Sequence, residues 1–145
     1  NEEAIASYDK ALEINPNNEW TWKSKGFTLK ELGKYSEAII CFDKAIQIKP
    51  DYDLAWCHRG YAFLRLENFE DAWESFEKEQ EFDEGSAQYD KACFFAVQNQ
   101  PRLTIKHLKK AISIDSKKYL ERAKTDSDFD SIRDSLRFQT LIQEK

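Results

Sequence analysis

The sequence repeats itself with a period of 34 residues, and this feature limits the possible folds more than any other. Trp56 follows Trp22 by 34 positions, and Gly60 follows Gly26 by the same interval. The other pairs at this interval are Ala4 and Ala38, Tyr8 and Phe42, Ala11 and Ala45, Pro16 and Pro50, Ala38 and Ala72, Phe42 and Phe76, and Ala45 and Glu79. A fixed period of this length is typical of arrays in which every repeat is one supersecondary unit that packs on the next.

Each repeat is predicted to be a pair of antiparallel helices. Apolar residues recur at helical spacing, as in the run Ala38, Ile39, Phe42, Ala45 and Ile46. The first helix of a pair is expected at about residues 19–31, 53–65 and 86–98, and the second at about 2–14, 36–48, 70–82 and 102–114. The chain contains only 4 glycines and 3 prolines, which is too few for a protein rich in β-turns.

The ends of these helices are marked by particular residues. Pro16 and Pro50 are expected to stop the second helices, because proline has no N–H group and restricts the residue before it. Ser36 and Asp53 are the candidate N-caps.

Gly26 and Gly60 lie inside helices, where glycine costs about 1 kcal/mol relative to alanine. A packing reason must offset this cost. We expect each glycine to face the small residue of the paired helix, Ala38 or Ala72, so that the two backbones come close together.

The repeated residues resemble the tetratricopeptide repeat (TPR) family over about residues 1–116. The residues at its signature positions are Ala4, Tyr8, Ala11 and Pro16; Trp22, Gly26, Leu29, Ala38, Phe42, Ala45 and Pro50; Trp56, Gly60, Phe63, Ala72 and Phe76; and, shifted by two residues, Ala92, Phe95, Leu108 and Ala111. The departures from the family pattern are Lys25, Arg59, Glu79, Glu84 and Thr104.

The resemblance implies an all-α fold, a right-handed α-solenoid superhelix of antiparallel helix pairs. It also implies a domain organisation. Residues 1–16 would be the second helix of a truncated first repeat, 17–50 and 51–84 two regular repeats, and 85–116 a divergent repeat. Residues 117–145 would be a C-terminal cap.

The predicted cap resembles the closing segment that is common after bacterial TPR arrays. Tyr119, Leu120 and Ala123 would seal the last helix pair. The residues expected to fold against it are Phe129, Ile132, Phe138, Leu141 and Ile142.

At the other end, residues 1–14 form a second helix without its partner, and the sequence contains no methionine. The chain is therefore expected to be a fragment or a processed form. Its exposed N-terminal edge could support self-association.

Catalytic and metal-binding patterns are weak. The only histidines are His58 and His107, and there is neither a glycine-rich loop nor a serine elbow. Cys57, His58 and Cys93 lie on neighbouring first helices, but packing cysteines near a surface histidine is the expected arrangement. No catalytic, cofactor-binding or metal-binding residue is therefore predicted, and no cofactor.

The run Asp126, Asp128 and Asp130 begins like a calcium loop, but Ser131 and Arg137 stand where that loop needs glycine and glutamate. An acidic cluster at the start of a helix is the favoured interpretation.

The charge and the hydropathy exclude two classes of partner. The formal net charge of -5 argues against non-specific nucleic-acid binding, which needs a basic surface. No apolar run approaches the roughly 20 residues of a membrane span, and no signal peptide is visible. Three cysteines without framework spacing favour thiols in a reducing compartment, so a cytoplasmic location is expected.

In the TPR family the first helices line the inner groove, so residues on their remaining faces are the candidate partner-binding site. These are Trp20, Lys23, Phe27, Lys30, Leu54, Cys57, His58, Tyr61, Arg65, Tyr89 and Asp90. The same faces also carry Ser24, Glu31, Cys93 and Val97. The set is aromatic with a modest basic bias, which suits a peptide or helix with apolar anchors and some acidic residues. Several of these aromatics could instead be partly buried between repeats.

The resemblance implies a non-enzymatic scaffold for protein–protein interaction. The clamp that some TPR arrays use for chaperone C-termini is not expected, because Phe27 and Tyr61 stand where it would place asparagines. A regulatory or targeting segment of a larger enzyme or signalling protein is the alternative. A true enzyme is the third possibility, and it would require turnover or bound metal.

Overall fold

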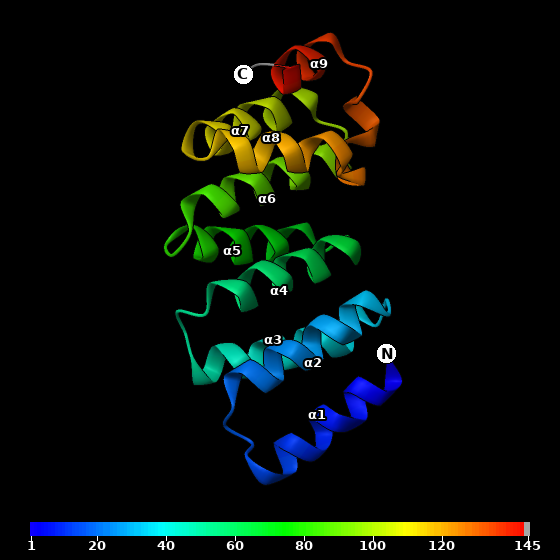
Figure 1. The fold of residues 1–145 in the computed structure, drawn as a ribbon, viewed down its shortest axis with the longest axis vertical. Coiled ribbons are helices and arrows are strands. Elements are labelled where there is room, and N and C mark those ends of the chain that lie inside the picture. The colour runs from blue at the N-terminus through cyan, green and yellow to red at the C-terminus, as the bar shows by residue number, and fades with distance from the viewer. Residues whose placement is uncertain (144–145) are drawn as a thin grey trace. The chain divides into compact units, whose positions relative to one another are not determined.

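A computed structural model describes residues 1–143, and all secondary structure there is helical (Figure 1). The chain divides into two compact units, Asn1–Phe82 and a second that begins at Asp83. The first unit contains α1 (Glu2–Ile14), α2 (Glu19–Glu31), α3 (Tyr35–Ile48), α4 (Asp53–Arg65) and α5 (Phe69–Gln80). The second contains α6 (Glu84–Val97), α7 (Pro101–Ile114), α8 (Ser116–Thr125), the 3-10 helix η1 (Ser127–Ile132) and α9 (Leu136–Gln143).

The predicted helices agree with these bounds to within two residues at each end. The antiparallel pairs are α2 with α3, α4 with α5, and α6 with α7. In the first unit, α1 packs on α2 and α3 packs on α4, so each pair covers the next. Within the described residues the fold is an all-helical array of antiparallel pairs, as expected.

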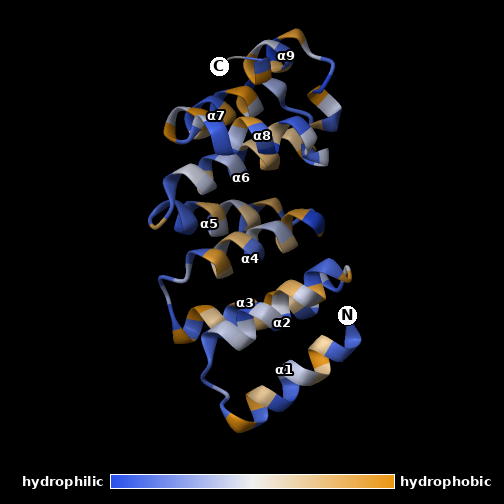
Figure 2. Cartoon of the chain, viewed as in Figure 1, coloured by the Kyte–Doolittle hydropathy of each residue, from blue (hydrophilic) through white to orange (hydrophobic). Residues whose placement is uncertain are grey.

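Each helix turns an apolar side toward its neighbours. Hydrophobic and hydrophilic residues alternate along α1 and α4 in Figure 2, as they do in amphipathic helices. One cluster of buried residues in the first two pairs contains Leu29, Ala38, Ile39, Cys41, Phe42 and Ala62. The partly buried residues Ile5, Trp22, Tyr35 and Phe63 pack against it.

At Gly26 and Gly60 the closest contact is with an aromatic ring of the paired helix. A Cβ atom at Gly60 would meet the ring of Phe76, with Cδ1 at 2.8 Å and Cζ at 2.9 Å. At Gly26 it would meet the ring of Phe42, with Cε1 at 2.6 Å and Cδ1 at 2.9 Å. The nearest neighbour is therefore a phenylalanine rather than Ala38 or Ala72, because the ring fills the space that a glycine leaves.

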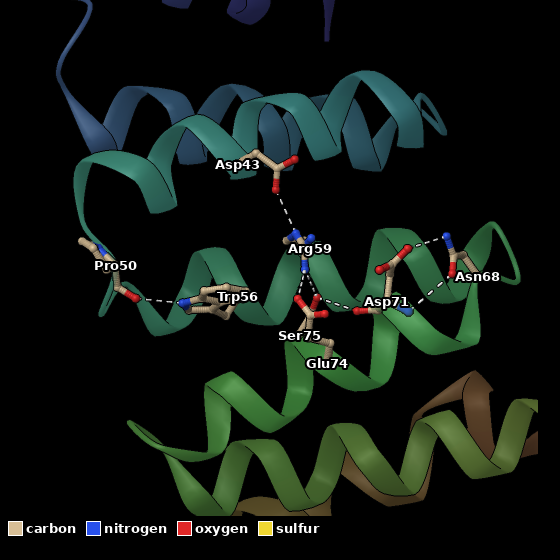
Figure 3. Close-up of polar contacts among 8 residues, drawn as sticks. All are labelled: Asp43, Pro50, Trp56, Arg59, Asn68, Asp71, Glu74 and Ser75. Carbon is tan, nitrogen blue, oxygen red and sulfur yellow. Dashed lines mark hydrogen bonds and ion pairs between the residues drawn. The ribbon is translucent and has the colours of Figure 1, made fainter.

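The 34-residue period also appears in the hydrogen bonds. The indole N–H of Trp22 donates to the carbonyl oxygen of Pro16 at 2.8 Å, and that of Trp56 donates to Pro50 at 2.9 Å (Figure 3). Each tryptophan thus ties a first helix to the turn that precedes it. This contact gives both prolines a role beyond ending the second helices, which stop at Ile14 and Ile48.

A second repeated contact joins neighbouring helix pairs. Lys25 lies 2.6 Å from Asp9, and Arg59, one period later, lies 2.8 Å from Asp43. Arg59 also donates to the hydroxyl of Ser75 at 2.7 Å (Figure 3). From α4 it therefore reaches α3 and α5 together. The cations that depart from the family pattern are thus bonded across repeats.

The predicted N-caps are wrong. The N-cap residues of α3 and α4 are Lys34 and Tyr52, and neither makes a side-chain capping bond. Ser36 and Asp53 lie inside the first turns instead. The side chain of Asn68 does cap α5, accepting a hydrogen bond from the backbone N–H of Asp71 (Figure 3).

The predicted capping residues lie in the interior of the second unit. Tyr119, Leu120, Ala123, Phe129, Ile132, Phe138 and Leu141 are buried, and Ile142 is half-buried. Residues 144–145 of the predicted cap lie outside the described residues. The repeat boundaries given by the sequence remain predictions.

Candidate functional site

One face of α2 carries four of the predicted site residues. Trp20, Lys23, Phe27 and Lys30 are spaced by three and four positions, so they share one side of the helix. Asn18 starts this helix, because its side chain accepts a hydrogen bond from the backbone N–H of Thr21 at 3.0 Å. The cap sets the helix's starting point and, with it, the direction of this face.

The equivalent face of α4 carries Leu54, His58, Tyr61 and Arg65, again at spacings of three and four. The two faces meet at His58. The edge of Phe27 approaches the His58 ring at a centroid distance of 5.0 Å. The residues on α2 and α4 therefore form one continuous surface, which we call the α2–α4 face.

Large apolar side chains on the α2–α4 face are open to solvent. Trp20 is 57% exposed, Phe27 41% and Leu54 47%. Trp20 also meets Tyr8 of α1 edge to face, at a centroid distance of 6.3 Å. Exposed apolar groups gathered on one surface, unlike isolated ones, are a feature of binding sites.

Cations lie over the rings of this face. Lys23 lies 5.7 Å from the centroid of Trp20, and Arg65 lies 6.0 Å from that of Tyr61. Lys30 lies 5.0 Å from the Phe27 centroid and 5.6 Å from that of Tyr61. Each contact contributes roughly 0.5–1 kcal/mol where it is exposed, and together they order the aromatic side chains.

His58 of α4 joins the two helices by contacting Phe27 and Lys30 of α2. Its Nδ1 lies 3.3 Å from the ammonium nitrogen of Lys30. Because an ammonium group only donates, Nδ1 is the acceptor and the ring carries its proton on Nε2. The ring also stacks on Phe42, at a centroid distance of 5.8 Å. This environment is that of a positioning residue.

A polar recess of about 210 Å³ opens at the C-terminal ends of α2 and α4. Its lining consists of Lys30, Glu31, Tyr35, Tyr61 and Arg65. The lining contains two cations and two phenol groups but only one carboxylate, so the recess can bind an acidic side chain of a partner. Sequence reasoning missed Tyr35, because it is the first residue of α3 and does not belong to a first helix.

Two predicted residues offer little surface. Cys57 is only 9% exposed. Tyr89 is fully buried in the second unit, where its ring stacks on Tyr119 at 5.4 Å and meets Phe129 at 5.6 Å. Tyr89 is therefore a core residue there, and its helical position alone could not reveal that the cap covers it. The site role of Asp90, on the same helix, remains a prediction.

The acidic run after α8 is a capping network. The carboxylate of Asp126 accepts hydrogen bonds from the Tyr89 hydroxyl at 2.8 Å and from the backbone N–H of Asp128 at 3.0 Å. Ligand atoms of Cys93, Asp126 and Asp128 come within 4.8 Å of one another, so these three could hold a metal. Both oxygens of Asp126 accept hydrogen bonds, and these bonds account for the position of its carboxylate.

Burial controls the ionisation of several groups. Burial chiefly raises the pKa of the Cys41 thiol to about 11, opposed by nearby Lys25. Burial also raises the pKa of Tyr119 to about 12, and raises that of Tyr89, where Cys93 and Asp126 add to the effect. All three groups therefore stay protonated near neutral pH, and none is prepared to act as a nucleophile.

Two family profiles match the first unit. One, described as a tetratricopeptide repeat, covers residues 7–40, and the other, described as a TPR repeat, covers residues 26–67. The fold is a TPR array. Within the residues that the structure describes, no helix is long and apolar enough to cross a membrane. No curated protein matches the sequence.

Several solved structures share this fold. MamA of Desulfovibrio magneticus is 20% identical with a TM-score of 0.72, over 97% of this chain and 83% of that chain. YrrB, described as a TPR protein with an unusual peptide-binding site, is 18% identical with a TM-score of 0.66, over 92% and 69%. A TPR protein from Parabacteroides merdae is 21% identical with a TM-score of 0.78, over 97% and 56%. At these identities the likeness shows the fold alone.

Proposed function

We propose that this TPR protein is a non-enzymatic interaction module that binds a protein segment on the α2–α4 face. The observation that carries the proposal is the alternation of exposed apolar side chains and cations there. Trp20, Phe27 and Leu54 are open to solvent, while Lys30 lies between the rings of Phe27 and Tyr61. Such a surface fits an extended peptide or a helix with apolar anchors and acidic residues.

The polar recess supplies the place for an acidic side chain of that partner. Lys30 and Arg65 line it, and Tyr35 and Tyr61 add phenol groups. A carboxylate there would accept hydrogen bonds from charged donors, which are roughly twice as strong as neutral ones. The apolar anchors would then contact Phe27 and Leu54 outside the recess.

Preorganisation supports a binding role. The contacts among Phe27, Lys30 and His58 cross from α2 to α4 and order the side chains before a partner arrives. A surface that is already ordered loses little conformational entropy on binding. Because these contacts hold the side chains in place for a partner, we propose binding rather than catalysis.

The alternative, a regulatory or targeting segment of a larger enzyme or signalling protein, uses the same face and differs only in what is attached to the chain. YrrB, whose fold is similar, is described as having a peptide-binding site. We also propose a cytoplasmic location, because Cys41, Cys57 and Cys93 form no disulfide in the described structure.

The test uses a set of fluorescein-labelled synthetic peptides that combine two leucine or phenylalanine residues with two glutamates at varied spacing. Fluorescence anisotropy measures their affinity for the whole chain. We expect at least one spacing to bind, with an affinity that falls as salt is added. Lys23→Glu combined with Tyr61→Ala should weaken this binding by about tenfold or more.

Two further variants separate binding from folding. Trp20→Ala alters a largely exposed side chain, so it should weaken binding while leaving the far-UV circular dichroism unchanged. Lys10→Glu makes the same charge change as Lys23→Glu on an exposed residue of α1, and it is the control. Equal affinity in the control and in the Lys23 and Tyr61 double variant would place the binding site elsewhere.

A further inference from the structure

The second unit carries a concentration of positive charge that the proposed function does not use. Residues 101–124 contain eight lysines and arginines against Asp115 and Glu121, although the whole chain has a net charge of -5. These residues form α7 and α8. A local excess of one charge in a chain of the opposite charge marks a surface for a complementary partner.

The outer side of α7 is the most regular part of this charge. Arg102, Lys106, Lys109 and Lys110 are all exposed, at spacings that keep them on neighbouring rows of the helix. From Arg102 to Lys110 they extend over nine residues, a rise of about 12 Å or two helical turns. The opposite side of α7 is buried.

An apolar recess of about 330 Å³ lies next to this row, between α7 and α9. It is lined by Ile105, Lys109, Leu136, Arg137, Thr140 and Leu141. Ile105 and Leu141 are buried and form its floor, whereas Leu136 is 79% exposed and stands at its rim. The recess therefore has apolar walls and cationic residues at its edge.

The cations around the recess are not engaged with the protein's own acids. Within residues 1–143, none of Arg102, Lys106, Lys109, Lys110 and Arg137 takes part in an ion pair. On the neighbouring helix α8 an ion pair does form, between Lys124 and Glu121 at 3.0 Å. Charges without a partner in the fold remain available for an external one.

We propose that this surface, the α7–α9 face, binds an acidic amphipathic helix of a partner protein. One leucine-like side chain of that helix enters the recess against Ile105, Leu136 and Leu141. Carboxylates one turn away on the same helix meet Lys109 and Arg137, and further acids meet Lys106 and Arg102 along α7. The recess fixes the position of the partner's helix, and the row of cations along α7 fixes the direction in which that helix runs.

A protein helix fits this face better than a lipid bilayer does. The apolar part is a hollow with a single strongly exposed side chain, Leu136, so it has little apolar surface to insert into a bilayer. A hollow needs a projecting side chain, which a helix supplies. Nucleic acid fits less well, because the exposed residues described on α7 and α9 include no aromatic ring on which a base could stack.

The test uses a synthetic helical peptide of about 15 residues, held helical by a side-chain lactam because short isolated helices are marginal in water. It carries one leucine flanked by glutamates at i-4, i+3 and i+4. Two companion peptides replace the leucine by alanine or the glutamates by glutamine. Anisotropy gives the affinities for the whole chain, and amide chemical shifts locate the site.

We expect the acidic leucine peptide to bind, and to shift the amides of Ile105, Lys109, Leu136 and Thr140. Both companion peptides should bind about tenfold more weakly or worse. Lys109→Glu combined with Arg137→Glu should cause a similar loss. Leu136→Ser, at an exposed position, should weaken binding without lowering the melting temperature.

The double variant Lys10→Glu and Lys44→Glu is the control, because it makes the same change in net charge on two exposed residues of the first unit. The proposal would be overturned if the acidic peptide did not bind, or if it bound equally to the control and to the Lys109 and Arg137 double variant. Amide shifts confined to the first unit would overturn it as well. Vesicles containing phosphatidylserine form a separate arm. If the vesicles bind the parent protein but not the Lys109 and Arg137 double variant, and the peptide binds neither, the face is a membrane contact and the proposal fails.

Discussion

Gly60→Ala tests the packing that determines how closely α4 and α5 approach. The added methyl group would lie 2.8 Å from Cδ1 and 2.9 Å from Cζ of Phe76, and closer still to Cε1. Carbon atoms in contact are ordinarily about 3.5–4.0 Å apart. The ring must therefore move by about 1 Å, or the two helices must separate.

The ring has little room to make that movement. Phe76 is fully buried, and the edge of the Tyr61 ring lies against it at a centroid distance of 5.7 Å. Overpacking of this kind costs about 1–3 kcal/mol, and so tight a site lies in the upper half of that range. Replacing a helical glycine by alanine stabilises the helix itself by about 1 kcal/mol. We expect a net loss of about 1–2 kcal/mol in the free energy of unfolding.

Urea denaturation followed by far-UV circular dichroism measures the loss, which should appear as a lower midpoint with an unchanged slope. The matched control places Gly60→Ala in a Phe76→Leu background, where the smaller side chain leaves room for the methyl group. There the same substitution should be neutral or stabilising by up to about 1 kcal/mol. If Gly60→Ala stabilises the parent protein, or destabilises both backgrounds equally, the ring contact does not explain the glycine.

Three further outcomes follow from the same contacts. Arg59→Ala should lower the free energy of unfolding, measured by urea denaturation, by about 2 kcal/mol, because it removes hydrogen bonds to two neighbouring helices. Arg59→Lys should recover part of the loss. An unchanged free energy of unfolding would show that these bonds are no stronger than the hydrogen bonds to water that replace them. The raised pKa values of Cys41 and Tyr119 mean that the folded state favours the protonated form of each group. Their contribution to the stability of the fold is complete below about pH 9 and is lost as the pH rises through about 11 for Cys41 and about 12 for Tyr119. The melting temperature, measured from pH 7 to 12, should therefore fall above about pH 9, and a constant melting temperature would contradict the burial of these groups. Tyr89→Phe should cost about 1 kcal/mol, measured as a lower melting temperature, because the Asp126 carboxylate loses its phenol donor; an unchanged temperature would mean that water replaces the hydroxyl.

The sequence by itself determined the helices, their pairing and most of the core. The 34-residue period and the apolar positions within it predicted every helix end from α1 to α7 to within two residues. The same pattern placed Phe42 and Phe76 at equivalent repeat positions, and both are fully buried. Local periodicity suffices for this because an amphipathic helix can bury only one side.

Only the tertiary structure decided which side chains meet across helices. It placed Gly60 against Phe76 rather than Ala72, joined Lys30 to His58, and buried Tyr89 beneath the cap. It also brought Leu136 beside Ile105 to form the recess on the α7–α9 face. Periodicity identifies the buried side of a helix, but the contacts on that side depend on how far each helix is rotated against its neighbour and on the rotamers that then fit.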